Sequence, residues 1–376
     1  MSIIIFIIIL LVLVLVHEAG HFFTAKGFGI RVDEFGFGFP PKLFGIKKGE
    51  TEYTFNALPI GGFVKIYGQG VNETEVLKGN FKTEEKEADV DAHRSFMNKP
   101  KWQQAIVLSA GIFANFLLAW VLFSVGFMSG LPTSVGTEPS GYTATDVHLV
   151  ITSVSAKSPA EGAGLKVGDK ILSLASSKDN VAKINPDTLK TFVMSHPDKE
   201  IDIGYTRGQN PTINIVKVKP EMTKENTPLI GIAMDEIGTV RLPVHRALWE
   251  GLKLDWSMTE GTVVGLFTLI GQGIHGKGSM SSITGPVGMV GIVGDAYQFG
   301  FVYLLSFAAL ISVNLAIINL IPFPALDGGR LLFLLIEKIK GSRLNPKIAN
   351  MANTIGFVIL IALMLFVTYH DVIKLF

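Results

Sequence analysis

Cysteine is absent from the 376-residue sequence, and charged residues are scarce. Without cysteine there can be no disulfide, no thiolate metal ligand and no cysteine nucleophile, so histidine, aspartate and glutamate are left to hold a metal ion. Only 17% of the residues are charged and 48% are hydrophobic, which is too apolar for a typical water-soluble protein. The net charge of +1 gives no reason to expect a nucleic-acid partner. The composition therefore indicates an integral membrane protein.

Long apolar stretches recur along the chain. Crossing a bilayer takes about 20 residues of helix, and four segments meet this requirement: residues 3–25, 104–128, 303–321 and 350–369. The first lacks a basic leading region and a cleavage site, so we expect a retained span rather than a secretion signal. The sequence predicts a polytopic α-helical membrane protein with four transmembrane helices, whose membrane domain comes in two parts, 1–134 and 303–376.

Basic residues are concentrated in one short connection. Residues 330–347 carry five Lys or Arg and a single acid, whereas the first 25 residues carry neither Lys nor Arg. Because Lys and Arg accumulate on the cytoplasmic side of a membrane, we expect this connection in the cytoplasm and both termini outside it. A span entered from outside near residue 2 then places residue 17 roughly 22 Å deep in a core about 30 Å thick, nearer the cytoplasmic face.

Polar residues follow the first apolar run at once, in the sequence His17-Glu18-Ala19-Gly20-His21. Residues four apart share one face of a helix, so His17 and His21 can hold one zinc ion while Glu18 reaches a water molecule on it. Such groups are costly at the end of a membrane span unless something pairs with them. The motif alone leaves a satisfied histidine pair at a helix end as the alternative.

A catalytic zinc site takes three protein ligands and keeps one position for water. Asp327 is the candidate for the third ligand, because Pro322 and Pro324 break the third span just before it and the glycines after it permit a tight backbone turn. The aspartate could then turn toward a cavity rather than toward lipid. The alternative is that Asp327 caps the helix that follows.

A strand pair is predicted close to the zinc motif. Residues 52–66 contain two short strand patterns around a turn of proline and glycine, and we expect a re-entrant β-hairpin at about residues 50–67. A free strand edge can offer hydrogen bonds to a substrate helix that has been unwound. The alternative is an ordinary cytoplasmic hairpin. The candidate substrate-binding residues on the hairpin are Tyr53, Phe55, Phe63 and Val64.

A polar insert separates the second and third spans. Residues 158–172 predict a short helix, a glycine turn and a strand, and alternating apolar residues follow in 201–215. Residues 135–220 resemble a PDZ domain, so we expect an inserted extracytoplasmic α+β domain. It either binds peptide C-termini by strand addition or acts as a size filter or spacer. In the linker 221–302, residues 244–273 predict an amphipathic interfacial helix.

Together these motifs resemble the site-2 protease family of intramembrane zinc metalloproteases, and within it members of the bacterial regulator of sigma-E protease type. The resemblance covers nearly the whole chain. The segments that carry it are HEAGH at 17–21, GFGFPPKLFG at 36–45, the PDZ-like insert and NLIPFPALDGGR at 319–330.

The resemblance implies roles for particular residues. Zinc would be held by His17, His21 and Asp327, with Glu18 as general base. Asn319 would help to hold the substrate backbone, and Asn314, a little over one helical turn earlier, is expected to line the same cavity.

The sequence departs from the family pattern in two places. The best-known members of this type carry two tandem PDZ domains, whereas there is room for only one here. In residues 109–115 of the second span, Ile112 stands where proline is usual, which we expect to affect packing more than chemistry.

The predicted function is a zinc endopeptidase that cuts the transmembrane segments of single-pass membrane proteins in the bacterial cytoplasmic (inner) membrane. The resemblance implies regulated intramembrane proteolysis, with anti-sigma factors or remnant signal peptides as substrates. The alternative is a PDZ-bearing membrane adaptor with a structural metal site, although such a site would have no use for Glu18. A metal transporter is disfavoured because no second set of intramembrane acids marks a path.

Overall fold

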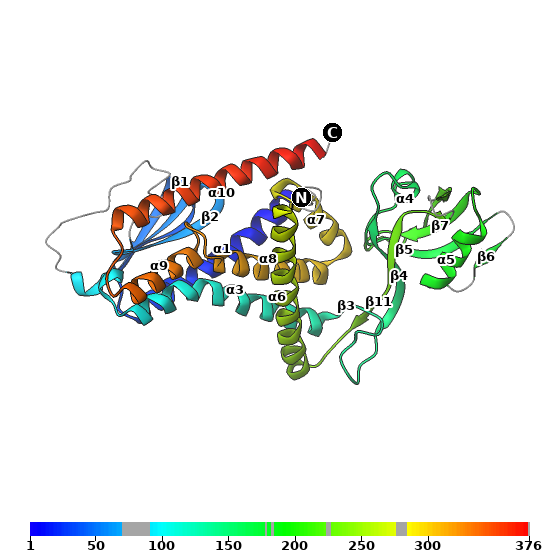
Figure 1. The fold of residues 1–376 in the computed structure, drawn as a ribbon. Helices are drawn as coiled ribbons and strands as arrows, with labels where there is room; N and C mark the ends of the chain where they lie inside the picture. Colours follow the sequence, from blue (N-terminus) through cyan, green and yellow to red (C-terminus); the bar gives the residue numbers. More distant parts are fainter. Residues whose placement is uncertain (70–90, 177–178, 182–183, 223–226, 276–283, 375–376) are drawn as a thin grey trace. The chain divides into compact units, whose positions relative to one another are not determined.

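The structure is a computed structural model, and it describes residues 1–69, 91–176, 179–181, 184–222, 227–275 and 284–374 (Figure 1). The chain forms two compact units. The first unit comprises Met1–Phe123, Gly251–Gly291 and Ala308–Phe376, and the second comprises Ser124–Glu250 and Ile292–Phe307.

The helices are α1 (Ser2–Gly27), α3 (Lys101–Ser129), α4 (Pro159–Gly162), α5 (Pro186–Ser195), α6 (Val244–Ile274), α7 (Pro286–Phe299), α8 (Phe301–Leu320), α9 (Asp327–Lys340) and α10 (Pro346–Lys374), with 3₁₀ turns η1 (Ala92–Arg94) and η2 (Phe96–Asn98). The strands are β1 (Val32–Lys48), β2 (Thr51–Ile66), β3 (Leu131–Ser134), β4 (Thr145–Val154), β5 (Lys170–Ala175), β6 (Asn180–Val181), β7 (Ile201–Thr206), β8 (Asn214–Val218), β9 (Glu221–Met222), β10 (Pro228–Leu229) and β11 (Ile232–Val240).

Four helices of the described chain are long and apolar enough to cross a membrane: α1, α3, α8 and α10. They coincide with the predicted spans to within a few residues at each end. In α1 large apolar side chains such as Ile3, Ile4 and Ile8 remain exposed, as expected for a helix that faces hydrocarbon. These four candidate spans agree with the predicted polytopic membrane protein.

The first unit is held together by close helix packing. Ala119 of α3 and Ala309 of α8 are fully buried beside Val313, and small residues at such positions let helix backbones approach closely. Leu254 and Met258 of α6 pack against the same cluster. Helix α6 covers the stretch predicted to be an amphipathic helix.

Strands β1 and β2 form one antiparallel sheet with an unexpected order. Phe35 pairs with both Val64 and Tyr53, so residues 32–37 lie between the two halves of β2. The prediction that the two halves of β2 pair with each other is therefore wrong. The segment around Gly61 must cross a whole strand, about 10 Å in total, rather than make a tight turn. The resulting order leaves residues 62–64 and residues 42–48 on opposite edges.

The second unit contains a seven-stranded sheet with the strand order β3-β11-β4-β5-β7-β8, in which β6 pairs with β5. Helix α4 and strand β5 occur where a helix, a glycine turn and a strand were predicted. The side chains of Ile151, Leu174 and Ile203 form its buried core together with Leu189 of α5. The sheet also includes β3 and β11, which flank the 135–220 region in sequence.

Candidate metal centre

Two helices distant in sequence bring three potential metal ligands together. His17 and His21 lie one turn apart on α1, and Asp327 is the first residue of α9. The two Nε2 atoms are 3.2 Å apart, and Asp327 Oδ2 lies 3.1 Å from Nε2 of His17 and 3.2 Å from Nε2 of His21. Both histidines are buried, with 7% of their surface exposed.

This arrangement fits a zinc ion. Ligand atoms held about 2.0–2.1 Å from one tetrahedral zinc lie about 3.3 Å from one another. The three atoms described above have nearly that separation, and two imidazoles with a carboxylate are ligands that zinc accepts. In the described part of the chain this is the one cluster of three such residues.

Asp327 is aimed at the histidines by a tight turn. Ala325 has a left-handed backbone with φ 76°, and its N–H donates to Oδ1 of Asn353 on α10 at 3.2 Å. A β-carbon on Gly328 would lie 2.3 Å from the carbonyl oxygen of Ile321, so the chain needs glycine there. The residue that caps α9 is Leu326, and Asp327 lies inside the helix with its carboxylate on the histidines.

The position of Asp327 suits a metal ligand. Its Oδ2 faces Nε2 of both histidines in a buried setting, and a carboxylate binds a metal in its anionic form.

A cavity of about 220 Å³ opens beside the three ligand atoms. Glu18 and Asn319 line it, and so do Phe63 and Val64 from the edge segment of β2. A β-carbon on Gly62 would lie 3.6 Å from Cγ of Glu18, so the strand passes close to that residue.

The other predicted site residues lie elsewhere. Asn314 accepts a hydrogen bond from Thr262 Oγ1 at 3.0 Å and is not among the residues that line the cavity. Tyr53 and Phe55 belong to the half of β2 on the far side of residues 32–37. The ring of Phe55 stacks on Phe37 rather than facing the cavity.

Several residues around the centre were not predicted. Arg330, Gln69 and Leu315 line the cavity. From α3, the carbonyl oxygen of Val107 lies 2.8 Å from Nδ1 of His21, and Nδ2 of Asn115 lies 3.1 Å from Nδ1 of His17. One signal was available in the sequence, because Asn115 is the lone amide side chain within the apolar stretch 105–128.

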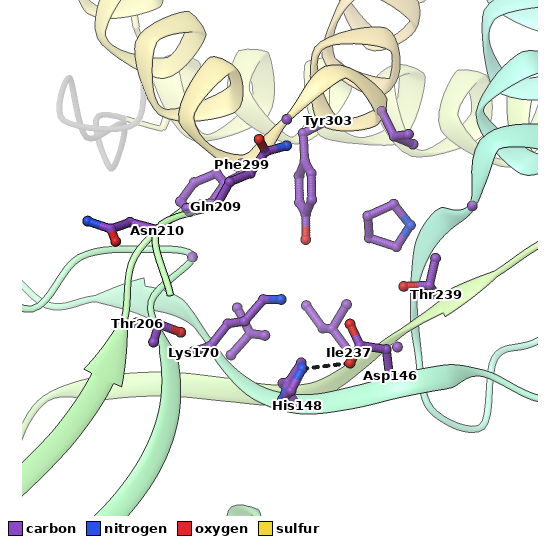
Figure 2. Close-up of a pocket in the computed structure, with 18 of the residues that line it drawn as sticks. Asp146, His148, Lys170, Thr206, Gln209, Asn210, Ile237, Thr239, Phe299 and Tyr303 are labelled. Atoms are coloured by element: carbon purple, nitrogen blue, oxygen red, sulfur yellow. Dashed lines mark hydrogen bonds and ion pairs between the residues drawn. The ribbon is translucent and has the colours of Figure 1, made fainter. Parts of the chain in front are cut away.

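A larger cavity of about 490 Å³ lies within the second unit (Figure 2). Lys170 and Tyr303 reach into it from opposite sides in Figure 2, and His148 pairs with Asp146 at 3.0 Å. No third histidine or carboxylate lines this cavity among the described residues. It therefore lacks the ligand set of a catalytic zinc site.

Comparison with known proteins identifies the family. The family model described as Peptidase family M50 matches residues 5–363. The chain belongs to peptidase family M50. This M50 member is 32% identical to the regulator of sigma-W protease RasP of Bacillus subtilis, with 100% of this chain and 99% of that protein covered. It is 30% identical to the zinc metalloprotease RasP of Geobacillus kaustophilus, with 100% and 98% covered.

Membership of M50, the site-2 protease family, confirms the resemblance inferred from the motifs. The protein is a membrane-embedded zinc metalloprotease with protein substrates. Its cofactor is zinc, in agreement with the donor set of His17, His21 and Asp327.

Proposed function

We propose that this M50 protease cleaves the transmembrane segments of single-pass membrane proteins, with His17, His21 and Asp327 holding the zinc ion and Glu18 acting as general base. The observation that carries this proposal is the cavity in which Glu18 lies beside three ligand atoms no more than 3.2 Å apart. A purely structural zinc site would have a fourth protein ligand and no open cavity. The described residues provide neither a fourth ligand nor a closed site.

The residues of the chain divide the chemistry among them. Zinc supplies Lewis-acid activation of water and of the scissile carbonyl group. Glu18 takes a proton from the attacking water and passes it to the nitrogen of the leaving amine. Asn319 lines the same cavity, where its side-chain amide can hydrogen-bond the substrate backbone.

A substrate that arrives as a helix must be unwound before attack. Each backbone group released in an apolar setting costs several kcal/mol unless a new partner is offered. Residues 62–64 pair with β1 on one side, and no described strand pairs with their other side. Since Phe63 and Val64 also line the cavity, this edge supplies backbone partners to an extended substrate. Tyr53 and Phe55 would then support the sheet rather than touch substrate.

The PDZ-like domain binds peptide C-termini or acts as a size filter. Strand β3 pairs with Ile237–Val240 of β11, whereas residues 232–236 pair with β4 alone. Helix α5 contacts β11, and Ile232 and Met234 of β11 pack against the cluster that contains Leu189 of α5. A strand edge beside a helix supports capture of an extended peptide. A peptide with a free carboxyl terminus should then bind more tightly than its amidated form, and equal weak binding of the two would favour the filter.

The protein lies in the bacterial cytoplasmic membrane with its termini and PDZ-like domain outside and the zinc centre toward the cytoplasm. The basic connection 330–347 supports this orientation. The Bacillus subtilis relative is named as a regulator of sigma-W protease, which supports anti-sigma factors as substrates of this chain. Remnant signal peptides are proposed as substrates from the family resemblance of the motifs alone.

The central test is cleavage of a labelled single-span protein by the purified enzyme. The parent should cut, Glu18→Gln should not cut while keeping its zinc, and Glu200→Gln, an exposed control, should cut as the parent does. A chelator should stop cleavage and added zinc should restore it. Cleavage that survives Glu18→Gln or sustained zinc removal would overturn the mechanism.

The strand edge has its own test. Proline lacks an N–H donor, so Phe63→Pro or Val64→Pro should slow cleavage without loss of zinc. The control is Ile46→Pro, on the opposite edge of the sheet. Unchanged cleavage in both cavity-side variants would count against strand pairing.

A further inference from the structure

Asn115 contacts His17, a candidate metal ligand, at the ring nitrogen that faces away from the proposed zinc position. Its side chain is fully buried in α3, and it is not among the residues that line the zinc cavity. The amide lies 3.1 Å from Nδ1 of His17, the ring nitrogen opposite the one that faces Asp327. Asn115 can therefore act on the zinc centre only through His17.

The protonation of the imidazole ring determines whether Asn115 must donate or accept the hydrogen bond to Nδ1 of His17. A neutral imidazole carries one proton, and the nitrogen that gives its lone pair to a metal carries none. When Nε2 of His17 is a ligand, Nδ1 therefore bears the proton and needs an acceptor. The same holds for His21, whose Nδ1 lies 2.8 Å from the carbonyl oxygen of Val107. A carbonyl oxygen only accepts, so the tautomer of His21 is fixed by the backbone.

For His17 the partner of Nδ1 is a side-chain amide, which has a donor end and an acceptor end. A half-turn about the Cβ–Cγ bond exchanges Oδ1 and Nδ2. Oδ1 of Asn115 has no hydrogen-bond partner in the described part of the structure, so no bond to that atom holds the amide in one orientation. The protonation of Nδ1 of His17 therefore sets whether Oδ1 or Nδ2 of Asn115 faces it. When Nε2 of His17 binds zinc, Nδ1 carries the proton and Oδ1 must face it.

We propose that Asn115 is a positioning residue for the zinc centre: its Oδ1 accepts the Nδ1–H of His17 and so fixes the ring and the tautomer that leave Nε2 free for the metal. This inference rests on the ligand role of His17 proposed above. Outer partners of this kind, when removed, typically cost about 10- to 100-fold in metal affinity.

The neighbouring helix supplies a matched control. Ser312 of α8 donates to the backbone carbonyl oxygen of Asn115 at 2.8 Å, and both residues are fully buried. Ser312→Ala removes a hydrogen bond at the same helix crossing without touching the amide or the imidazole. It therefore reports the effect of packing at this position alone.

The test measures zinc affinity of the full-length protein in detergent by competition with a coloured chelator, together with the melting temperature of the metal-free protein. Asn115→Leu, which has no acceptor, should weaken zinc binding by about 10- to 100-fold with little change in the metal-free melting temperature. Asn115→Asp keeps an acceptor oxygen and should restore most of the affinity. Ser312→Ala should lower the melting temperature and leave zinc affinity within about twofold, because the imidazole keeps its outer partner.

Two results would overturn the inference. One is parental zinc affinity in Asn115→Leu, and the other is an equal loss of affinity in Asn115→Leu and Ser312→Ala. His17→Ala separates this failure from failure of the proposed function. If His17→Ala loses zinc while Asn115→Leu keeps parental zinc affinity, only the inference about Asn115 is wrong and the proposed function stands. If His17→Ala itself keeps parental affinity, the ligand assignment falls as well.

Discussion

Gly111 of α3 lies directly against the ring of His21: a β-carbon added at Gly111 would come 2.3 Å from Nε2 of that histidine. This is the nitrogen that lies 3.2 Å from Nε2 of His17. Real β-carbons do not approach a ring atom so closely. Any residue larger than glycine at position 111 would therefore force the ring of His21 to move. The absence of a side chain at Gly111 thus makes room for the ring of His21, a candidate metal ligand on another span.

Gly111→Ala should lower zinc affinity by about tenfold or more, because the ring of His21 must move off its acceptor at Val107. Competition with a chelator measures the change. Gly265→Ala is the control, since a β-carbon there would meet nothing within 4 Å. Parental zinc affinity in Gly111→Ala would show that the histidine is not held where the structure has it.

The two asparagines of α8 should behave differently. Asn319→Ala should lower kcat/KM by about tenfold while zinc content is unchanged, because it removes an amide from the cavity wall. Asn314→Ala should lower the melting temperature and spare catalysis, because its partner is Thr262 of α6. The reverse pattern, measured on the same labelled substrate, would place Asn314 at the substrate.

Glu337 should be important for stability. This glutamate is 9% exposed, forms an ion pair with Lys101 and accepts the N–H of Leu344 at 2.8 Å. Glu337→Gln should lower the free energy of unfolding by about 1 to 2 kcal/mol, because the buried charge pair is lost while one hydrogen bond remains. The control Glu200→Gln disrupts an exposed pair with Lys217 and should leave the melting temperature unchanged.

Asp255 of α6 should make stability depend on pH. Burial raises the pKa of this carboxyl group to about 6 from 3.8, and its Oδ1 has no hydrogen-bond partner among the described residues. Since the folded protein holds this proton more tightly than the unfolded chain, stability falls as the pH rises from about 4 through about 6.

Asp255→Asn should therefore raise the free energy of unfolding by about 1 to 3 kcal/mol near neutral pH, and the gain should vanish below about pH 4. Melting curves of the parent and the variant across this range measure the difference. A constant difference at every pH would mean that the proton on Asp255 is not involved.

The candidate spans and the residues that gather in the candidate metal centre could be predicted from the sequence because their signals are local. An uncharged run defines α1, and the spacing of His17 and His21 needs only helical geometry. Asp327 could be identified as a candidate ligand because the prolines before it and the glycines after it indicate a turn at the end of the membrane helix.

Contacts between distant segments could not be predicted in this way. Residues 32–37 lie between the two halves of β2. The alternation of apolar and polar residues along a strand does not show which strand is its neighbour, so this order could not be predicted. The contact of Asn115 with His17 depends on how α1 and α3 face one another, which the periodicity of a uniformly apolar helix does not report. Helix α9 covers most of a segment that we predicted as a basic connection, and a helix there entered only through the alternative that Asp327 caps it.

The ligand from α9 stands 310 positions downstream of the first histidine. During synthesis the ribosome must therefore pass residue 327 before any nascent chain has a complete donor set. A chain that ends before residue 327 has both imidazoles of the proposed donor set but not its carboxylate. In the proposed mechanism, such a copy therefore lacks the carboxylate ligand of the zinc centre.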